Sequence, residues 1–161
     1  MGSTYSAKVV ADGLRMAIAV SRFNEPVTSQ LLGGALDALE QHRSGGSTAD
    51  VYWVPGAFEL PATVKRLCGT GRYDGVLALG ALIRGATGHY EYLASAVTTA
   101  LANVSVGADV PIAFGVLTCD TLEQALERAG KKDSNKGADA MVSLIEMVNL
   151  SSLIANPPEA Q

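Results

Sequence analysis

Four short apolar runs are the clearest pattern in this chain of 161 residues. They lie at residues 15–20, 50–54, 75–79 (within a predicted strand region at 73–82) and 111–117. Most positions in them are apolar in succession rather than in alternation with polar ones. Runs of this length and composition are typical of strands that are covered on both sides of a sheet. We therefore expect four strands that are apolar on both faces.

The segments between these runs have apolar residues at helical spacing. They predict helices over residues 27–42, 61–68, 89–106, 122–128 and 138–154, the fourth after a start at 120–123 that resembles a capping box. Strands that alternate with helices form a parallel sheet with helices on each side. The pattern predicts an α/β protein with a three-layer α/β/α, flavodoxin-like fold and a four-stranded parallel sheet.

The same pattern divides the chain into a domain with two flanking segments. We expect an N-terminal arm at residues 1–14, in which residues 8–10 could pair as an edge strand. One α/β domain is expected at 15–156. The two prolines near residue 157 predict a disordered tail at 157–161.

The carboxyl ends of the predicted strands indicate where a ligand would bind. In parallel sheets of this kind, ligands bind just beyond those ends. Chain order places on this rim Phe23, Glu59, Arg84, Thr87 and His89. We expect one site there, built from several loops.

Residues 80–89 form the most distinctive of these turns, with three glycines, Arg84 and His89 between a strand and a helix. Free N–H groups and the positive end of the helix dipole favour an anion at such a turn. The spacing matches neither the P-loop nor the dinucleotide fingerprint. It is consistent with a phosphate or carboxylate site, or with a plain loop in which Arg84 is solvated.

Each candidate side chain on the rim has two interpretations. Phe23 and Phe58 could stack on a flat heterocycle or could pack within their loops. Glu59 could bind a polyol or an amide, or could interact with the helix dipole. His89 could be a neutral imidazole that transfers protons, or a surface histidine.

The other residues with chemically active side chains give weaker evidence about function. Arg128 and Lys136 flank a polar loop, where side chains are ordinarily solvated. No Ser/His/Asp or Cys/His arrangement is evident, which disfavours covalent catalysis. The two histidines and two cysteines show no zinc-ligand spacing, so neither a metal site nor a disulfide framework is expected.

The amino-acid composition limits the classes of partner and the cellular compartment that we expect. The net charge of −4 disfavours a nucleic-acid groove or an anionic membrane surface. No signal peptide or membrane-spanning run is predicted, and two separate cysteines favour a reducing compartment, the cytoplasm. Charged residues make up only 17% of the chain, and the last predicted helix is apolar around most of its circumference. Both features predict that part of the surface packs against other copies of the chain.

Five segments in fixed order carry a resemblance to a known family. They are SRFN at 21–24, VPGAFELP at 54–61, LGALIRGATGHY at 79–90, PIAFGVLT at 111–118 and NKG at 135–137. Together they resemble the lumazine synthases, and the resemblance runs from about residue 8 to residue 154. This family condenses 5-amino-6-(D-ribitylamino)uracil with 3,4-dihydroxy-2-butanone 4-phosphate, without a metal or an organic cofactor. The products are 6,7-dimethyl-8-ribityllumazine, phosphate and water, in the penultimate step of riboflavin biosynthesis.

The resemblance implies a role for each matched residue. Phe23 would stack on the pyrimidine, whose edge would be lined by Ala81, Leu82 and Ile83. The ribityl chain would be held by Ala57, Phe58 and Glu59. His89 would transfer protons, and the phosphate would be held at the start of the helix by Gly85, Ala86 and Thr87.

The family's assembly implies roles for the other matched residues. Lumazine synthases form pentamers, and in some members twelve pentamers close into a hollow shell. A neighbouring subunit would contribute Phe114 near the pyrimidine, Arg128 at the phosphate, and Lys136. The short loop at 130–137 and the proline-free arm before Leu14 resemble the shell-forming members, for which riboflavin synthase would be a candidate partner.

Two positions depart from the family's pattern, since Gly88 and Cys119 stand where threonine is common. Gly88 would loosen the start of the helix, and Cys119 is a near-isosteric change. A flavin- or nucleotide-binding module without catalysis is an alternative function, because a flavodoxin-like sheet presents a similar rim. A purely structural shell protein is a third, which the intact candidate site residues disfavour.

Overall fold

Strands and helices alternate along residues 2–130 and 134–159, which the computed structural model describes. The strands are β1 (Arg15–Ser21), β2 (Thr48–Val54), β3 (Gly75–Ile83) and β4 (Ile112–Cys119). The helices are α1 (Glu25–Gln41), α2 (Leu60–Cys68), α3 (His89–Gly107), α4 (Leu122–Ala129) and α5 (Lys136–Ala155), with a short 3-10 helix, η1 (Ala57–Glu59), before α2. The four strands and five helices predicted within the domain are therefore all present, with ends shifted by up to a few residues.

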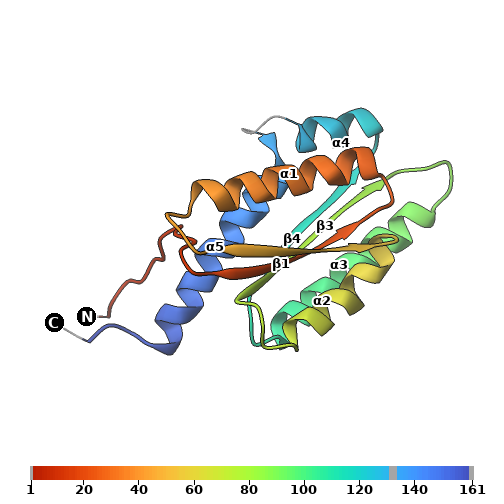
Figure 1. Ribbon diagram of the computed structural model, residues 1–161. Coiled ribbons are helices and arrows are strands. Elements are labelled where there is room, and N and C mark those ends of the chain that lie inside the picture. Colours follow the sequence, from red (N-terminus) through yellow and green to blue (C-terminus); the bar gives the residue numbers. More distant parts are fainter. Residues whose placement is uncertain (1, 131–133, 160–161) are drawn as a thin grey trace.

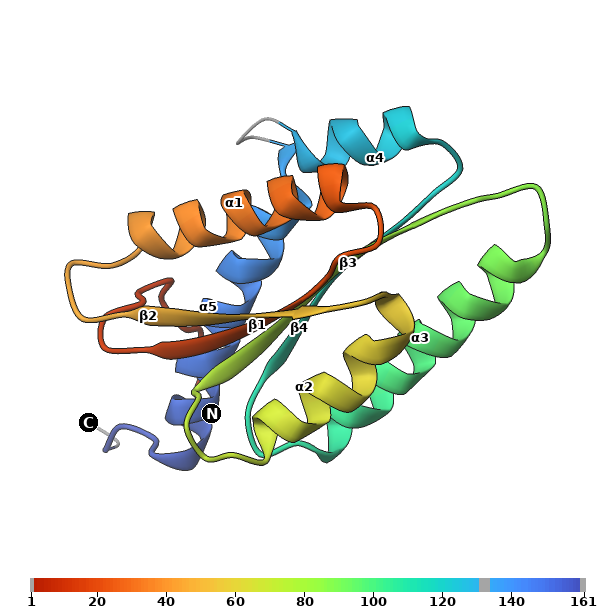
Figure 2. The same cartoon turned by 45° about the vertical axis from the view of Figure 1, so that its right-hand side comes forward.

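The four strands form one parallel sheet in the order β2-β1-β3-β4. Figure 1 shows α1, α4 and α5 on one face of this sheet and α2 and α3 on the other. The view in Figure 2 shows the same separation of the two helical layers. This arrangement confirms the predicted three-layer α/β/α fold.

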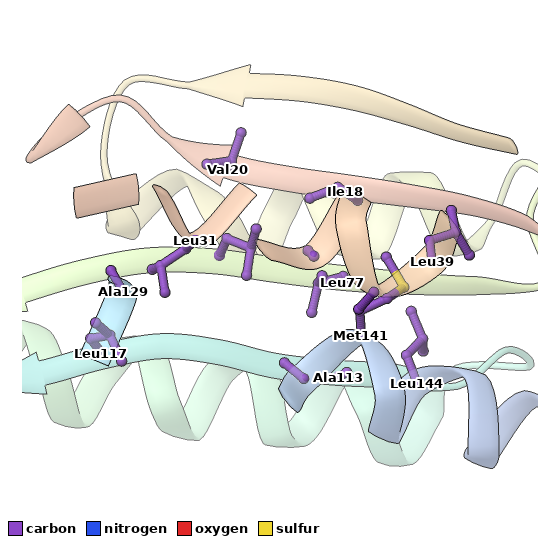
Figure 3. Packing of buried hydrophobic residues seen from close by; sticks show 14 of the residues in the cluster. Ile18, Val20, Leu31, Leu39, Leu77, Ala113, Leu117, Ala129, Met141 and Leu144 are labelled. Atoms are coloured by element: carbon purple, nitrogen blue, oxygen red, sulfur yellow. The ribbon is translucent and has the colours of Figure 1, made fainter. Parts of the chain in front are cut away.

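Each face of the sheet has its own hydrophobic core. Because successive residues of a strand point to opposite faces, Ile18 and Val20 pack toward α1 and α5, whereas Ala17 and Ala19 pack toward α2 and α3. Figure 3 shows the first of these cores, in which Ile18 and Val20 lie with Leu31 of α1, and with Leu77, Met141 and Leu144. The two central strands, β1 and β3, are thus buried on both sides as predicted.

The prediction of two covered faces is wrong for β2, and it holds only in part for β4, the other edge strand, in which Phe114 is 47% exposed. Strand β2 lies at the edge of the sheet, and only Val54 in it is fully buried. Trp53 is 38% exposed, and Asp50 is exposed while it accepts a hydrogen bond from the Tyr73 hydroxyl at 2.6 Å. An apolar run does not reveal whether a strand will be central or at an edge, because strand order is decided by the crossovers.

The N-terminal arm and the start of α4 also differ from expectation. Residues 8–10 form no strand in the described chain, because the arm is held against α5 by Asn149, whose Nδ2 donates to the carbonyls of Lys8 and Val10 at 2.8 Å each. The cap of α4 lies one residue later than predicted. Thr121 Oγ1 accepts the N–H of Gln124 at 3.1 Å and is the N-cap residue.

Helix α5 begins at Lys136, two residues before its predicted start, because Asn135 caps it. The Asn135 side chain, 3% exposed, accepts the Ala138 N–H at 3.0 Å and donates to the carbonyls of Gln30 and Ala129 at 2.9 and 2.8 Å. These bonds tie α5 to α1 and α4. Residues 131–133 of the predicted polar loop lie outside the described residues.

The outer face of α5 is only partly covered by this chain. Met147 and Ile154 are 46% and 73% exposed, while Met141 and Leu144 are buried in the first core. By length and composition, α5 is the one described helix that could cross a membrane, with a mean hydropathy of 1.4. Core helices of soluble proteins pass the same test. The contact between this face and another copy of the chain stays a prediction.

The ends of the chain contribute little to the fold. Residues 157–159 are exposed and belong to no helix or strand. The rest of the predicted tail, residues 160–161, lies outside the described part of the chain.

Candidate active site

A cavity of about 390 Å³ opens beyond the carboxyl ends of β1, β2 and β3. It lies where the rule for parallel sheets places a ligand. The predicted residues that line it are Phe23, Ala57, Phe58, Glu59, Ala81, Leu82, Ile83, Gly85, Thr87 and His89. The structure thus gathers on one rim segments that are separated by up to 66 positions in the chain.

The turn after β1 is held rigidly and leaves an aromatic ring free. Asn24 has a left-handed backbone (φ 62°), which asparagine tolerates better than most residues, and its Nδ2 donates to the Ala81 carbonyl at 2.8 Å. The Phe23 N–H donates to the Pro55 carbonyl at 3.0 Å. The ring of Phe23 is nevertheless 70% exposed. A fixed backbone with an exposed ring is suited to stacking on a flat ligand.

The turn after β2 presents a second ring and a carboxylate. Phe58 is 71% exposed, and Glu59 is exposed at the point where η1 leads into α2. A Cβ atom at Gly56 would lie 3.3 Å from Glu59 Oε2, so the missing side chain gives this carboxylate room. Ala57 is buried beneath them and anchors the turn. The carboxylate can therefore accept hydrogen bonds from ligand hydroxyl groups.

The glycine-rich loop (residues 85–88) joins β3 to α3 and is exposed throughout. His89 is the first residue of α3, and its N–H lies 3.4 Å from Thr87 Oγ1. No heavy atom lies within 4 Å of the place that a Cβ would take at Gly85, so a ligand can approach the backbone there. Ala86, a predicted phosphate residue, is not among the residues that line the cavity.

Arg84 lies on the predicted rim, directly after the end of β3, but it is not among the residues that line the cavity. Its Nε donates to Asp120 Oδ1 at 2.9 Å and its Nη1 to Glu91 Oε1 at 2.9 Å, while the guanidinium lies 4.9 Å from the centre of the Tyr90 ring. The hydrogen bonds that Arg84 donates to Glu91 and Asp120 raise the pKa of its guanidinium above the ordinary value. The alternative interpretation, in which Arg84 is only solvated, does not describe its contacts fully. The side chain is 47% exposed, but it also makes two ion pairs.

The other predicted residues lie in a separate hollow of about 440 Å³ beside β4, whose lining includes Phe114, Arg128, Lys136 and Asp139. Phe114 is 47% exposed, and Lys136 Nζ lies 3.4 Å from Asp139 Oδ2. The first cavity has no lysine or arginine among the residues that line it, whereas this hollow has two cations. The cavity that holds Phe23, Phe58 and His89 is therefore separate from the hollow that holds Arg128 and Lys136.

The two departures from the family pattern have local effects. Gly88 has an ordinary backbone (φ −70°, ψ 0°) and caps α3 without a side-chain hydrogen bond, which a threonine could supply. Cys119 is buried, and its Sγ accepts a hydrogen bond from Arg128 Nη1 at 3.1 Å. The thiol thus occupies a position from which a threonine hydroxyl could also contact the guanidinium.

Sequence reasoning missed four residues that line the cavity: Asn24, Gly56, Tyr90 and Leu93. Leu93 follows His89 by four positions, so helical spacing from the histidine could have found it. Tyr90 follows His89 by one position, which helical spacing does not place on the same face. Asn24 and Gly56 are neighbours of predicted residues in the same turns. No group of three or more His, Cys, Asp or Glu side chains suited to a metal ion occurs in the described residues.

Two comparisons with known proteins point to the same family. Residues 13–152 match the family model described as 6,7-dimethyl-8-ribityllumazine synthase. A curated relative of the same name from Lactiplantibacillus plantarum is 55% identical over 152 residues, which cover 94% of this chain and 96% of the relative. The matched region includes both hollows, all four strands and all but the last residues of α5. The chain belongs to the 6,7-dimethyl-8-ribityllumazine synthase family.

Proposed function

We propose that this chain is a transferase that condenses 5-amino-6-(D-ribitylamino)uracil with 3,4-dihydroxy-2-butanone 4-phosphate. The products are 6,7-dimethyl-8-ribityllumazine, phosphate and water. Family membership supports the reaction. The observation that carries it is one cavity with two exposed aromatic rings, a carboxylate, a glycine-rich helix start and a histidine.

The uracil substrate fits the apolar end of this cavity. The exposed ring of Phe23 stacks on the pyrimidine, and the backbone of Ala81, Leu82 and Ile83 lies along its edge. The ribityl hydroxyls are held by the second turn, residues 57–59, where the Glu59 carboxylate accepts hydrogen bonds. Stacking and hydrogen bonding together hold the 5-amino group in one place, which lowers the entropic cost of reaction.

The phosphate is held at the glycine-rich loop and by a second protomer. A phosphate dianion favours the N–H groups at the start of α3, yet the first cavity has no lysine or arginine in its lining. In an oligomer, the hollow of a neighbouring chain faces this cavity and brings Arg128 to the phosphate, with Phe114 and Lys136 beside it. Arg128 forms no salt bridge with any carboxylate of the described residues, so its charge is available.

The chemistry has three steps. The uracil amine attacks the ketone, and loss of water gives an imine. Removal of a proton from the adjacent carbon gives an enol, from which phosphate leaves. Addition of a proton to the resulting methylene carbon, with loss of the hydroxyl proton, gives a methyl ketone. Attack of the ribityl-bearing nitrogen on the new carbonyl, with loss of a second water, closes the lumazine ring. His89 moves protons in these steps, and Arg128 stabilises the charge that develops on the leaving phosphate.

Absorbance on mixing the purified protein with both substrates tests the reaction. Lumazine formation well above the uncatalysed rate is expected. Formation at the uncatalysed rate, with tight binding of the uracil, would instead indicate a binding module without catalysis.

The His89→Ala variant is expected to lower kcat by about 10- to 100-fold, at or below the low end of general acid–base contributions. The loss is modest because His89 is exposed, so water can carry protons in its place. The size of the assembly is expected to be unchanged, which light scattering measures. A His89→Ala protein that is monomeric would contradict the assignment of His89 to catalysis alone. His42→Ala is the matched control, since His42 lies on the other layer at the end of α1.

Assembly and compartment follow from the same proposal. The chain forms pentamers, and the short connection between α4 and α5 favours a shell of twelve pentamers in the cytoplasm. Riboflavin synthase, which consumes the product, is the candidate partner for such a shell. Electron microscopy distinguishes the two assembly sizes directly.

A further inference from the structure

We propose that Arg84 is a positioning residue that holds the glycine-rich loop (residues 85–88) in its phosphate-binding shape. It does so by tying the start of α3 to the end of β4. This inference rests on the proposed function, because it deepens the phosphate half of that site.

The contacts of Arg84 fix both ends of the glycine-rich loop. Arg84 precedes the loop, and its N–H donates to the Cys119 carbonyl at 2.9 Å, which continues the pairing of β3 with β4. Its side chain reaches across the loop to Glu91 in the first turn of α3 and sideways to Asp120 after β4, at 2.9 Å each. Both ends of the loop are thereby fixed to each other and to the sheet.

Few other contacts hold this loop. Figures 1 and 2 both show the connection between β3 and α3 projecting beyond the end of the sheet. A Cβ at Gly85 would meet no heavy atom within 4 Å, and one at Gly88 would meet only the Tyr92 ring, at 3.9 Å. Exposed loops with so few contacts open easily. Amides that must point at one anion lose affinity when the loop that carries them is mobile.

The shape of the arginine side chain is needed for this role. Nε binds one carboxylate and Nη1 binds another, so the planar fork satisfies two partners from different elements at once. The guanidinium also lies over Tyr90, at 4.9 Å, and Tyr90 lines the cavity. A lysine at this position would present a single ammonium and could not reproduce both bonds with the same geometry.

Exposed ion pairs add little to global stability. Arg84, Glu91 and Asp120 side chains are 47%, 66% and 65% exposed. The effect of Arg84 is therefore local, on the loop, and not on the unfolding of the whole protein. This difference separates a positioning role from a merely structural one.

Hydrogen exchange and steady-state kinetics of the assembled enzyme test the proposal. In Arg84→Met, amide exchange in residues 85–89 is expected to become about tenfold faster, while exchange in α5 is unchanged. The KM for the butanone phosphate is expected to rise about tenfold, and the KM for the uracil to stay within about twofold. Arg84→Lys should give a smaller rise, because it keeps the charge. Arg72→Met is the matched control, since Arg72 also stacks on a tyrosine, 5.2 Å from the Tyr73 ring, but before β3 begins.

Two results would overturn the proposal: unchanged exchange in residues 85–89 of Arg84→Met, or an equal rise of both KM values. If Arg84→Met does not assemble, Glu91→Gln removes one of the two ion pairs at an exposed position, and about a threefold rise in the phosphate KM is expected. An unchanged KM for the butanone phosphate in Glu91→Gln would also overturn the proposal. A wild-type protein that forms no lumazine would refute the proposed function, while the exchange measurement would still decide the role of Arg84.

Discussion

Replacing Arg128 with alanine is expected to lower kcat/KM for the butanone phosphate by about 10²- to 10³-fold, the effect of removing one electrostatic stabiliser of a developing charge. The physical reason is the missing cation: among the described residues no lysine or arginine lines the first cavity, so in the proposed assembly nothing there replaces the guanidinium of the neighbouring chain. Affinity for the uracil should change much less. Steady-state kinetics with each substrate varied, and calorimetry with the uracil, measure the two effects.

The Arg128→Lys variant is the matched control for charge. It should retain part of the activity, because an ammonium keeps the charge but loses the planar fork. A larger loss of uracil affinity than of phosphate use in Arg128→Ala would remove Arg128 from its assigned role. Cys119→Ala, which deletes the sulfur that Arg128 contacts at 3.1 Å, should have a smaller effect of the same kind.

Mixed assemblies test whether the site is shared between protomers. When His89→Ala and Arg128→Ala chains are assembled together in equal amounts, about one site in four would combine an intact His89 with an intact Arg128 from its neighbour. The mixture is then more active than either variant alone. A mixture no more active than its components would indicate that both residues act within one chain.

The Gly137→Ala variant is expected to lower the free energy of unfolding by more than about 3 kcal/mol, the upper range for overpacking. An added Cβ would lie 2.0 Å from the Leu31 carbonyl oxygen and 2.7 Å from its carbon. These are backbone atoms, so the two helices must separate. That movement would also strain the bond from Asn135 Nδ2 to the Gln30 carbonyl. Urea unfolding at fixed protomer concentration, followed by Trp53 fluorescence, measures the loss.

Gly33→Ala is the control on the same helix pair. Gly33 lies on the exposed side of α1, and an added Cβ there would meet no heavy atom within 4 Å. Because alanine is the better helix former, this variant should be about 0.5–1 kcal/mol more stable than the wild type. A loss below about 0.5 kcal/mol for Gly137→Ala would contradict the tight crossing of α1 and α5.

The first cavity was predictable for a simple reason. Phe23, Phe58 and His89 each follow the end of an apolar run, and a parallel sheet brings such positions to one rim. Their convergence needs only element order, not the details of packing. The family resemblance added the division of roles among them, which stays a prediction, while the family match shows membership of the family.

The direction of long polar side chains was not predictable in this way. Arg84 follows a strand end like its neighbours, yet it binds Glu91 and Asp120 and is not among the residues that line the cavity. Asp120 is 36 positions distant, and its place beside Arg84 depends on the pairing of β3 with β4. The edge position of β2 was not predicted for a related reason, since the residues of one strand do not determine its place in the sheet.

The sequence by itself determined the alternation of strands and helices, the apolar composition that buries β1 and β3 on both faces, and the turns that supply the site. These properties are local, because they follow from hydrophobic periodicity and from residues adjacent in the chain. Only the tertiary structure decided the strand order, the close crossing of α1 and α5 at Gly137, and the separation of Arg128 from the cavity of its own chain. These properties depend on contacts between segments far apart in sequence, whose geometry is set by packing and strand register together.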